Sequence, residues 1–374
     1  MTSQPAHMLS EGRAGESPVS GAAVFLTGFL VALAACLVSV ATERFWHTDS
    51  EFYWIHAEGI LQGTLWFPYN PWGYSVLLVP FVWLGLSPVT ALLVLHPPAA
   101  GACVWLLARL CREHGRRCTL VAVGLLLTHL GFQSMAALLL PDLWTALLLL
   151  LTASALKRGR GVESGLWLGL GAWVRSAGLT AACAVMAVLL LFRRGLLVGV
   201  VSGFLVTLVA VSLWAGHLAG HPMFISDQGS LGHHWKPVAG GFTETTDDER
   251  ERRGDLGYVG FALVEPATFV QERYFTAMNL LFPWPLGDER GFWHKTATAY
   301  PEALLWALAG VALATGKGRR LLWRSWPLWA LALGAAAVHL AFHSQIRHRT
   351  MWAPLWIALL VPAAQASWVK WRGR

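Results

Sequence analysis

Charged residues are scarce in this chain: 13% of its 374 residues are Asp, Glu, Lys or Arg, while 55% are hydrophobic. A soluble domain carries about 25% charged residues, so this sequence lacks the polar coat that a water-soluble globule needs. Mean hydropathy is positive, at +0.50. This composition excludes a soluble enzyme, a disordered chain and a secreted scaffold held by disulfides. Long apolar runs recur along the chain and predict an all-α polytopic membrane protein.

Cysteine is also rare, and its spacing fits no metal site. The five cysteines lie in apolar runs or in one arginine-rich loop, which argues against a metal–thiolate centre. Tryptophan is abundant instead, at 21 residues, and its ring favours the membrane interface. The formal net charge of +7 is typical of the positive-inside bias of membrane proteins, so we expect membrane lipids and no nucleic acid among the partners.

The basic turns of the sequence predict its topology, because such turns stay on the cytoplasmic side of a membrane. They lie at 109–117, 157–160, 193–194, 317–324 and 370–374, which places both termini inside. We expect about ten transmembrane helices, at residues 21–42, 89–110, 119–140, 142–157, 163–174, 176–192, 196–217, 301–316, 323–343 and 350–369.

This topology divides the chain into four segments. They are a disordered cytoplasmic N-terminus at 1–20, an N-terminal transmembrane module at 21–217, a large outer loop at 218–300 and a C-terminal transmembrane module at 301–374. The first module includes a first outer loop at 43–88. In that loop, residues 52–61 and 72–86 predict interfacial helices.

Three acids lie next to predicted spans on the outer side. Asp49 and Glu51 follow the first span, and Asp142 begins a later one directly after Pro141. Partial desolvation raises the pKa of a carboxylate and suits it to act as a general base, so these acids are the candidate catalytic residues. The alternative is structural, with Asp49 and Asp142 capping the helices that follow them. Residue types alone leave both interpretations open.

Several outer-face residues predict an anionic ligand. Arg175 lies at the tip of a tight hairpin, and Arg347 and Arg349 lie in the last outer turn, against the positive-inside rule. A planar guanidinium suits a phosphate, and the alternative is that these side chains snorkel to lipid headgroups. His233 and His234, in the large loop, are interpreted as ligand-contacting residues in preference to metal ligands.

The order of these features resembles the bacterial integral-membrane glycosyltransferases of the GT-C fold, in the branch of the protein mannosyltransferases and lipid A aminoarabinose transferase. The resemblance runs from about residue 21 to residue 369. Its motifs are the acidic stretch Thr48 to Tyr53, the interfacial start Asn70 to Tyr74, the pair Pro141-Asp142, the Gly-rich run 229–241 and the basic turn and proline from Arg347 to Pro354.

The resemblance implies an inverting glycosyltransferase in a bacterial inner membrane. Its donor would be a polyprenyl-phosphate-linked sugar, and its acceptor a glycolipid, polysaccharide or protein on the outer face. Asp49 would be the base, and Glu51 or Asp142 would orient the acceptor or tune Asp49. No cofactor is assigned, and a divalent metal ion, Mg²⁺ or Mn²⁺, stays open.

The same resemblance assigns the cations to the leaving phosphate, whose developing charge needs fixed positive groups. Arg347 and Arg349 are the main candidates, with Arg175 and Lys236 beside them. Two other functions compete with transfer. One is a lipid or sugar transporter or flippase without catalysis, against which the lack of an internal repeat argues. The other is a non-catalytic assembly subunit of a cell-envelope complex.

Overall fold

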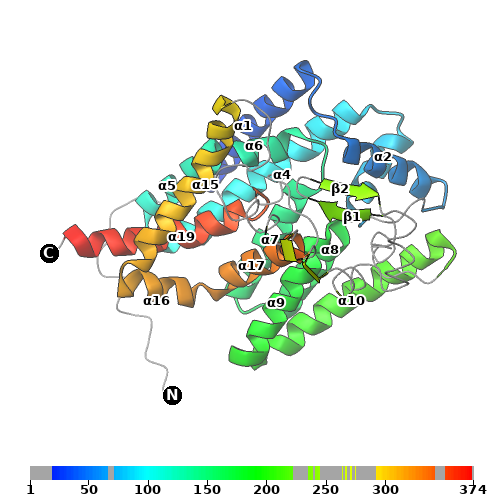
Figure 1. Ribbon diagram of the computed structural model, residues 1–374. Helices are drawn as coiled ribbons and strands as arrows, with labels where there is room; N and C mark the ends of the chain where they lie inside the picture. Colours follow the sequence, from blue (N-terminus) through cyan, green and yellow to red (C-terminus); the bar gives the residue numbers. More distant parts are fainter. Residues whose placement is uncertain are drawn as a thin grey trace.

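The computed structural model describes residues 19–65, 71–221, 235–238, 241–244, 292–341 and 350–372, with isolated helical residues between 263 and 274. These parts are almost entirely helical (Figure 1). The helices are α1 (Gly21–Ala41), α2 (Thr48–Leu61), α3 (Gly73–Trp83), α4 (Pro88–Cys111), the short 3-10 helix η2 (Arg112–His114), α5 (Arg116–Thr128), α6 (Leu130–Ala137), α7 (Asp142–Lys157), α8 (Gly161–Val174), α9 (Ser176–Phe192), α10 (Arg194–Ala219), α15 (Phe292–Leu313), α16 (Gly316–Arg324), α17 (Trp326–Ala341) and α19 (Ala353–Arg372).

Within the described residues, three helices are long and apolar enough to cross a membrane: α1, α4 together with η2, and α10. Helices α5 and α6 add a fourth span if they count as one, although they are bent by 59° at the break between them. The other apolar helical stretches, including Ala299–Leu313 of α15 and Ala353–Val369 of α19, have 17 residues or fewer, and a span needs about 20. Ten spans are therefore not supported, even though helices lie at the predicted ranges.

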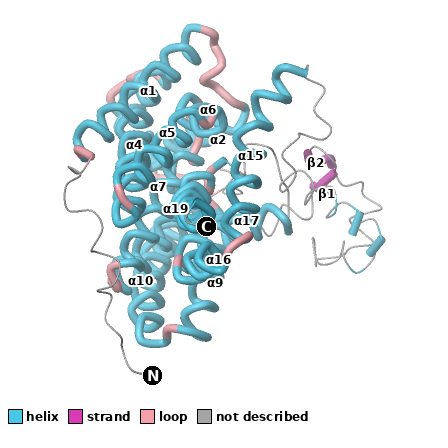
Figure 2. The backbone as a smooth tube through the Cα atoms, turned by 90° about the vertical axis from the view of Figure 1, so that its left-hand side faces the viewer, coloured by secondary structure: helices cyan, strands magenta, loops and turns pink. Residues whose placement is uncertain are grey.

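The surfaces of α1 and α10 indicate a membrane protein. In each helix, only 28% of the most apolar stretch is buried, whereas 67% is buried in α4. Leu26, Leu30 and Leu37 of α1 are each about half exposed. Both helices lie on the outside of the helical body in the two views (Figures 1 and 2). Apolar faces of this size suit contact with lipid, because water penalises large exposed apolar patches.

The interior is built from α4, α7, α8 and α9, and small residues bring their neighbours close. Helix α8 packs along α10, α9 along α17, and α1 along α4. A Cβ atom added at Gly165 of α8 would lie 2.1 Å from the Val200 carbonyl oxygen of α10. A Cβ atom at Gly203 of α10 would lie 2.2 Å from the Val162 carbonyl oxygen. Glycines spaced in this way let two apolar helices approach backbone to backbone.

Basic turns gather at one end of the body, which we call the basic end (Arg112–Arg117, Lys157–Arg160 and Arg193–Arg194). Lys157 Nζ lies 2.7 Å from Glu113 Oε1 and joins the first two turns. Gly161, beside Arg160, faces Gly199 near the start of α10. Helix α7 ends, α8 begins and α9 ends at the basic end. Asp142 at the start of α7 and Arg175 between α8 and α9 therefore lie at the opposite end of the body.

A small β-hairpin lies beside the otherwise helical structure, which agrees with the all-α prediction. Strands β1 (Trp235–Val238) and β2 (Gly241–Glu244) pair antiparallel, with Trp235 opposite Glu244 and Lys236 opposite Thr243. The hairpin lies within the predicted large loop and stands apart from the helical body (Figure 2). The sequence analysis interpreted this stretch as a Gly-rich run; Gly241 is the first residue of β2, and the residues before it alternate too briefly to signal a strand.

Candidate functional site

Asp142 and Arg175 form a buried ion pair. Arg175 Nη1 donates to Asp142 Oδ2 at 2.9 Å, and the side chains are 13% and 2% exposed. Burial lowers the pKa of Arg175, but its interactions with Asp142 first, and then with Tyr53 and Asp49, outweigh burial and raise this pKa above its ordinary value. The guanidinium is therefore charged at neutral pH. The other oxygen of Asp142, Oδ1, is buried with no hydrogen-bond partner among the described residues.

Local structure explains how these two residues meet. Asp142 lies in the first turn of α7, and Pro141 is the N-cap without a side-chain hydrogen bond. Arg175 is the single residue between α8 and α9 and has an extended backbone. The turn is tight because Gly178 faces Gly171, where a Cβ atom would lie 2.1 Å from backbone. Asp142 is therefore not a helix cap, contrary to the structural alternative. Its negative charge in the first turn of α7 is stabilised by the positive end of the helix dipole.

Helix α2 brings Tyr53 and Asp49 toward this site: Tyr53 lies in the same buried apolar cluster as Leu140 and Val174, which precede Pro141-Asp142 and Arg175, and the Asp49 carboxylate helps to raise the pKa of Arg175. The two residues are four apart and share one face of the helix. The N-cap of α2 is His47, whose Nδ1 accepts from the Asp49 N–H at 3.1 Å, while the His47 N–H donates to Ser50 Oγ. Asp49 is therefore not the cap, and its half-buried carboxylate lies with Oδ1 3.7 Å from His47 Nδ1.

Glu51 does not belong to this group. It lies two residues after Asp49, about 200° around the helix, and it is exposed. The structure thus gathers Asp49, Asp142 and Arg175 at one end of the body and leaves Glu51 on the surface. We call Asp49, Tyr53, Asp142 and Arg175 the carboxylate site.

A buried hydrogen bond between Tyr74 and His96 supports the carboxylate site. His96 Nδ1 donates to the Ala136 carbonyl at 3.0 Å, so its Nε2 accepts from the Tyr74 hydroxyl at 2.8 Å. Burial raises the pKa of Tyr74 well above its ordinary value, and the charges of Tyr53 and Asp142 raise it further. Tyr53 also packs edge-on against Tyr74, with ring centroids 5.4 Å apart. This pair was not predicted from the sequence, although a histidine inside an apolar run is the signal that marks it.

Three tryptophans lie beside Arg175. The Trp72 ring centroid is 5.0 Å from those of Trp173 and Trp214, and the latter two are 5.6 Å apart. They join the start of α3 to the ends of α8 and α10. Trp72 is fully buried, and the indole N–H groups of Trp72 and Trp173 have no partner among the described residues. Aromatic rings with unused donors suit a ligand that has both apolar and hydroxyl groups.

The remaining predicted ligand-binding residues fall largely outside the described residues. They are His233, His234, Arg347 and Arg349. Lys236 lies in β1. The phosphate-binding role of Arg347, Arg349 and Lys236, and the ligand contacts of His233 and His234, therefore stay predictions.

The carboxylate site does not fit a divalent metal ion. Asp142 is already neutralised by Arg175, and that fixed cation repels a second one. Glu51 is too far around α2 to join Asp49. Among the described residues, no three His, Cys, Asp or Glu side chains come together as a metal site requires.

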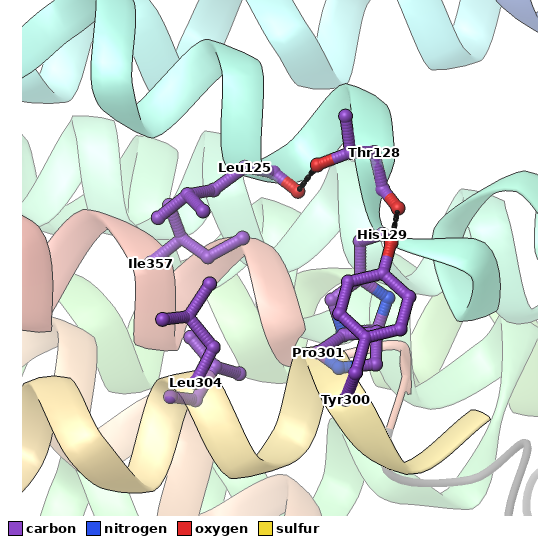
Figure 3. Close-up of a pocket in the computed structure, with 8 residues that line it drawn as sticks. Leu125, Thr128, His129, Tyr300, Pro301, Leu304 and Ile357 are labelled. Atoms are coloured by element: carbon purple, nitrogen blue, oxygen red, sulfur yellow. Dashed lines mark hydrogen bonds between the residues drawn. The ribbon is translucent and has the colours of Figure 1, made fainter. Parts of the chain in front are cut away.

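A second polar group lies where α5 and α6 break (Figure 3). His129 is the N-cap of α6, and its Nδ1 accepts the Phe132 N–H at 3.2 Å. Its Nε2 therefore carries the proton and lies 3.6 Å from Glu302 Oε1 of α15. Both side chains are largely buried, and the Tyr300 hydroxyl donates to the Thr128 carbonyl nearby. The sequence analysis did not single out this pair, since each partner is a lone polar residue in an apolar run.

The hollow at this break is small and mostly apolar, with Leu125, Leu304 and Ile357 along its wall (Figure 3). Its volume of about 10 Å³ has room for about one water. The carboxylate site, where Asp142 pairs with Arg175 and indole N–H groups without a partner among the described residues lie nearby, is the better candidate for a functional site. Comparison with protein-family models, curated proteins and solved structures finds no match to this chain.

Proposed function

We propose that this chain is a multi-pass, GT-C-like glycosyltransferase of a bacterial inner membrane, moving a sugar from a polyprenyl-phosphate donor to an envelope acceptor. The observation that carries the proposal is the carboxylate site. Asp142 and Arg175, which are 33 residues apart, pair at the end of the body opposite the basic turns, and the Asp49 carboxylate of α2 acts on the same arginine. That end is the outer side if the basic end is cytoplasmic.

The lengths of the central helices support a site recessed from the membrane surface. Helix α8 has 14 residues, which is about 21 Å at 1.5 Å per residue. A hydrocarbon core is about 30 Å thick. Arg175, at the end of α8, therefore lies about 9 Å below the outer boundary when the basic end is level with the inner one. A donor whose tail stays in lipid holds its phosphate in the headgroup layer above this depth, so a recessed site has to open toward that layer.

Each residue of the site has a distinct proposed role. The Asp49 carboxylate accepts the proton of the acceptor hydroxyl as its oxygen attacks the anomeric carbon, and the bond to the donor phosphate breaks with inversion. Asp142 holds Arg175 with one oxygen and offers Oδ1, otherwise unpaired, to an acceptor hydroxyl. Arg175 directs its remaining N–H groups toward developing negative charge. Asp142 is thus a positioning residue, and no step needs a metal ion.

The proposal is tested in cells of the source organism from which the gene is deleted. We expect mass spectrometry of the deletion strain to show accumulated polyprenyl-phosphate sugar and an envelope glycan lacking one sugar. Wild type and Glu51→Gln should restore both, whereas Asp49→Asn should lower transfer by about 100-fold or more, the range for loss of a general base. Unchanged donor lipids and glycans in the deletion strain would overturn the proposal.

One observation favours the competing function, a lipid or sugar transporter. Broken helices and ionisable groups within apolar spans are typical of transport sites, and His129 and Glu302 provide both. If this function holds, Glu302→Gln abolishes movement of a labelled lipid sugar across proteoliposomes and Asp49→Asn leaves it intact. No movement in the wild type, together with sugar transfer that Asp49→Asn abolishes and Glu302→Gln leaves intact, supports transfer.

A further inference from the structure

Helix α16 is a short, strongly basic helix between α15 and α17 (Figure 1). Thr315 caps it by accepting the Gly318 N–H at 3.1 Å. Four of its residues are exposed cations, namely Lys317, Arg319, Arg320 and Arg324. No Asp or Glu follows Glu302 in the sequence, so this part of the chain supplies no acid to neutralise them.

An aromatic surface lies among these cations. Trp323 of α16 is 62% exposed and stacks on Trp329 of α17, with ring centroids 5.9 Å apart. Phe192, at the end of α9, is 59% exposed and packs edge-on against Trp323 at 5.8 Å. Arg193 and Arg194 follow Phe192 directly and are exposed. Cations from two elements therefore surround one exposed aromatic surface at the basic end.

The acids at the basic end are already used by other residues. Glu113 pairs with Lys157 at 2.7 Å, and Glu163 pairs with Arg158 and Arg160 at 2.8 and 3.1 Å. In the part of the chain that the structure describes, no ion pair involves the cations of α16 or Arg193 and Arg194.

Three of these arginines instead bond to nearby backbone carbonyls. Arg319 donates to Leu313, Arg320 to Gly316 and Arg194 to Leu190, at 2.7 to 3.1 Å. Each contact uses one nitrogen, and a guanidinium has five N–H donors. The other donors of each guanidinium are not used in these contacts and suit a phosphate.

We propose that α16, with Phe192, Arg193, Arg194 and Trp329, binds an anionic phospholipid of the leaflet at the basic end. The cations hold the phosphate, and the exposed rings of Phe192 and Trp323 contact the upper part of the acyl chains. Juxtamembrane cations and interfacial tryptophan are the groups that recognise such lipids. A soluble polyanion would satisfy the cations but would leave the aromatic surface exposed to water. This site is independent of the proposed transferase activity.

The test is lipid titration of the full chain, purified in detergent and observed by native mass spectrometry. The probes are phosphatidylglycerol and, as a neutral comparison, phosphatidylcholine. We expect the triple variant R319Q/R320Q/R324Q to bind phosphatidylglycerol about tenfold more weakly, because each removed cation contributes to the attraction. Binding of phosphatidylcholine should not change.

The matched control is R112Q/R116Q/R117Q, which removes three exposed arginines from another turn of the basic end and changes the net charge equally. It should keep the wild-type affinity for phosphatidylglycerol. The single variants Arg320→Gln and Arg324→Gln should each weaken binding about threefold, so the test does not depend on the triple variant folding. Equal loss in both triple variants, no loss in either, or equal competition by inorganic pyrophosphate would overturn the proposal.

Discussion

The pairing of Asp142 with Arg175 is the residue-scale feature on which the carboxylate site depends. Each partner is isolated in apolar surroundings, and each is stable there because the other neutralises it. We expect Asp142→Leu or Arg175→Met alone to destabilise the fold by about 3–5 kcal/mol, since each leaves an uncompensated buried charge. The thermal midpoint of the purified protein in detergent measures this loss.

The double variant D142L/R175M separates stability from function. Replacing both partners by apolar residues of similar size often restores stability, so its thermal midpoint should return close to that of the wild type. Sugar transfer should stay lost, because the double variant has neither Asp142 Oδ1 nor the Arg175 guanidinium. Recovered stability together with recovered transfer would show that the pair only supports the fold.

The buried hydrogen bond between Tyr74 and His96 gives a second prediction at the scale of single residues. Tyr74→Phe removes the donor to His96 Nε2 and leaves that nitrogen buried without its partner, at a cost of about 1–3 kcal/mol. The expected result is a lower thermal midpoint. Tyr300→Phe is the control, because the Tyr300 residue is exposed and loss of its hydroxyl leaves a carbonyl that water can reach. A drop in both variants, or in neither, contradicts the assigned role of the Tyr74 hydroxyl.

At the scale of elements, close contact between α8 and α10 depends on glycine. A methyl group at Gly165 meets the backbone of α10, whereas one at Gly124 of α5 meets nothing within 4 Å. Gly165→Ala should therefore separate the helices and lower the thermal midpoint. Gly124→Ala should leave it unchanged or raise it, because alanine favours a helix by about 1 kcal/mol over glycine. A midpoint unchanged by Gly165→Ala would show that α8 and α10 are not closely packed.

Helix positions were predictable from the sequence because charged turns interrupt its apolar runs. The prediction of 142–157 matches α7, and that of 176–192 matches α9. The break at His129 was not predicted, since leucine-rich sequence continues on both sides of it. The break at Ser325, where α16 ends before α17, was not predicted either, because the predicted span 323–343 crosses it. Local polar contacts decide both breaks, and hydropathy does not register them.

The carboxylate site was predictable as a set of residue types but not as an arrangement. Asp49, Asp142 and Arg175 stand out because charge is rare in this chain. Their grouping depends on which helices pack together, which apolar sequence leaves undetermined. Glu51 was equally prominent in the sequence, and only the rotation of α2 separates it from Asp49. Tyr74 and His96 are 22 residues apart, and no local pattern connects them.

At the scale of the whole molecule, the two ends of the helical body should lie on opposite sides of a membrane. The basic end carries paired and unpaired cations, and the other end carries the carboxylate site. Labelling with a membrane-impermeant maleimide tests this separation. Of the five cysteines, four are buried and Cys183 is exposed, so Cys183→Ala gives a background with little reactivity.

Glu58→Cys on α2 and Arg160→Cys beside α8 then report on the two ends. Glu58 lies on the helix that contributes Asp49, and Arg160 lies at the basic end and is exposed. In intact cells we expect the maleimide to label Glu58→Cys and to reach Arg160→Cys only after the membrane is permeabilised, because the basic end stays cytoplasmic. Labelling of both cysteines from the same side would mean that α7, α8 and α9 together do not cross the bilayer. The carboxylate site would then lose its access to a donor lipid in the outer leaflet.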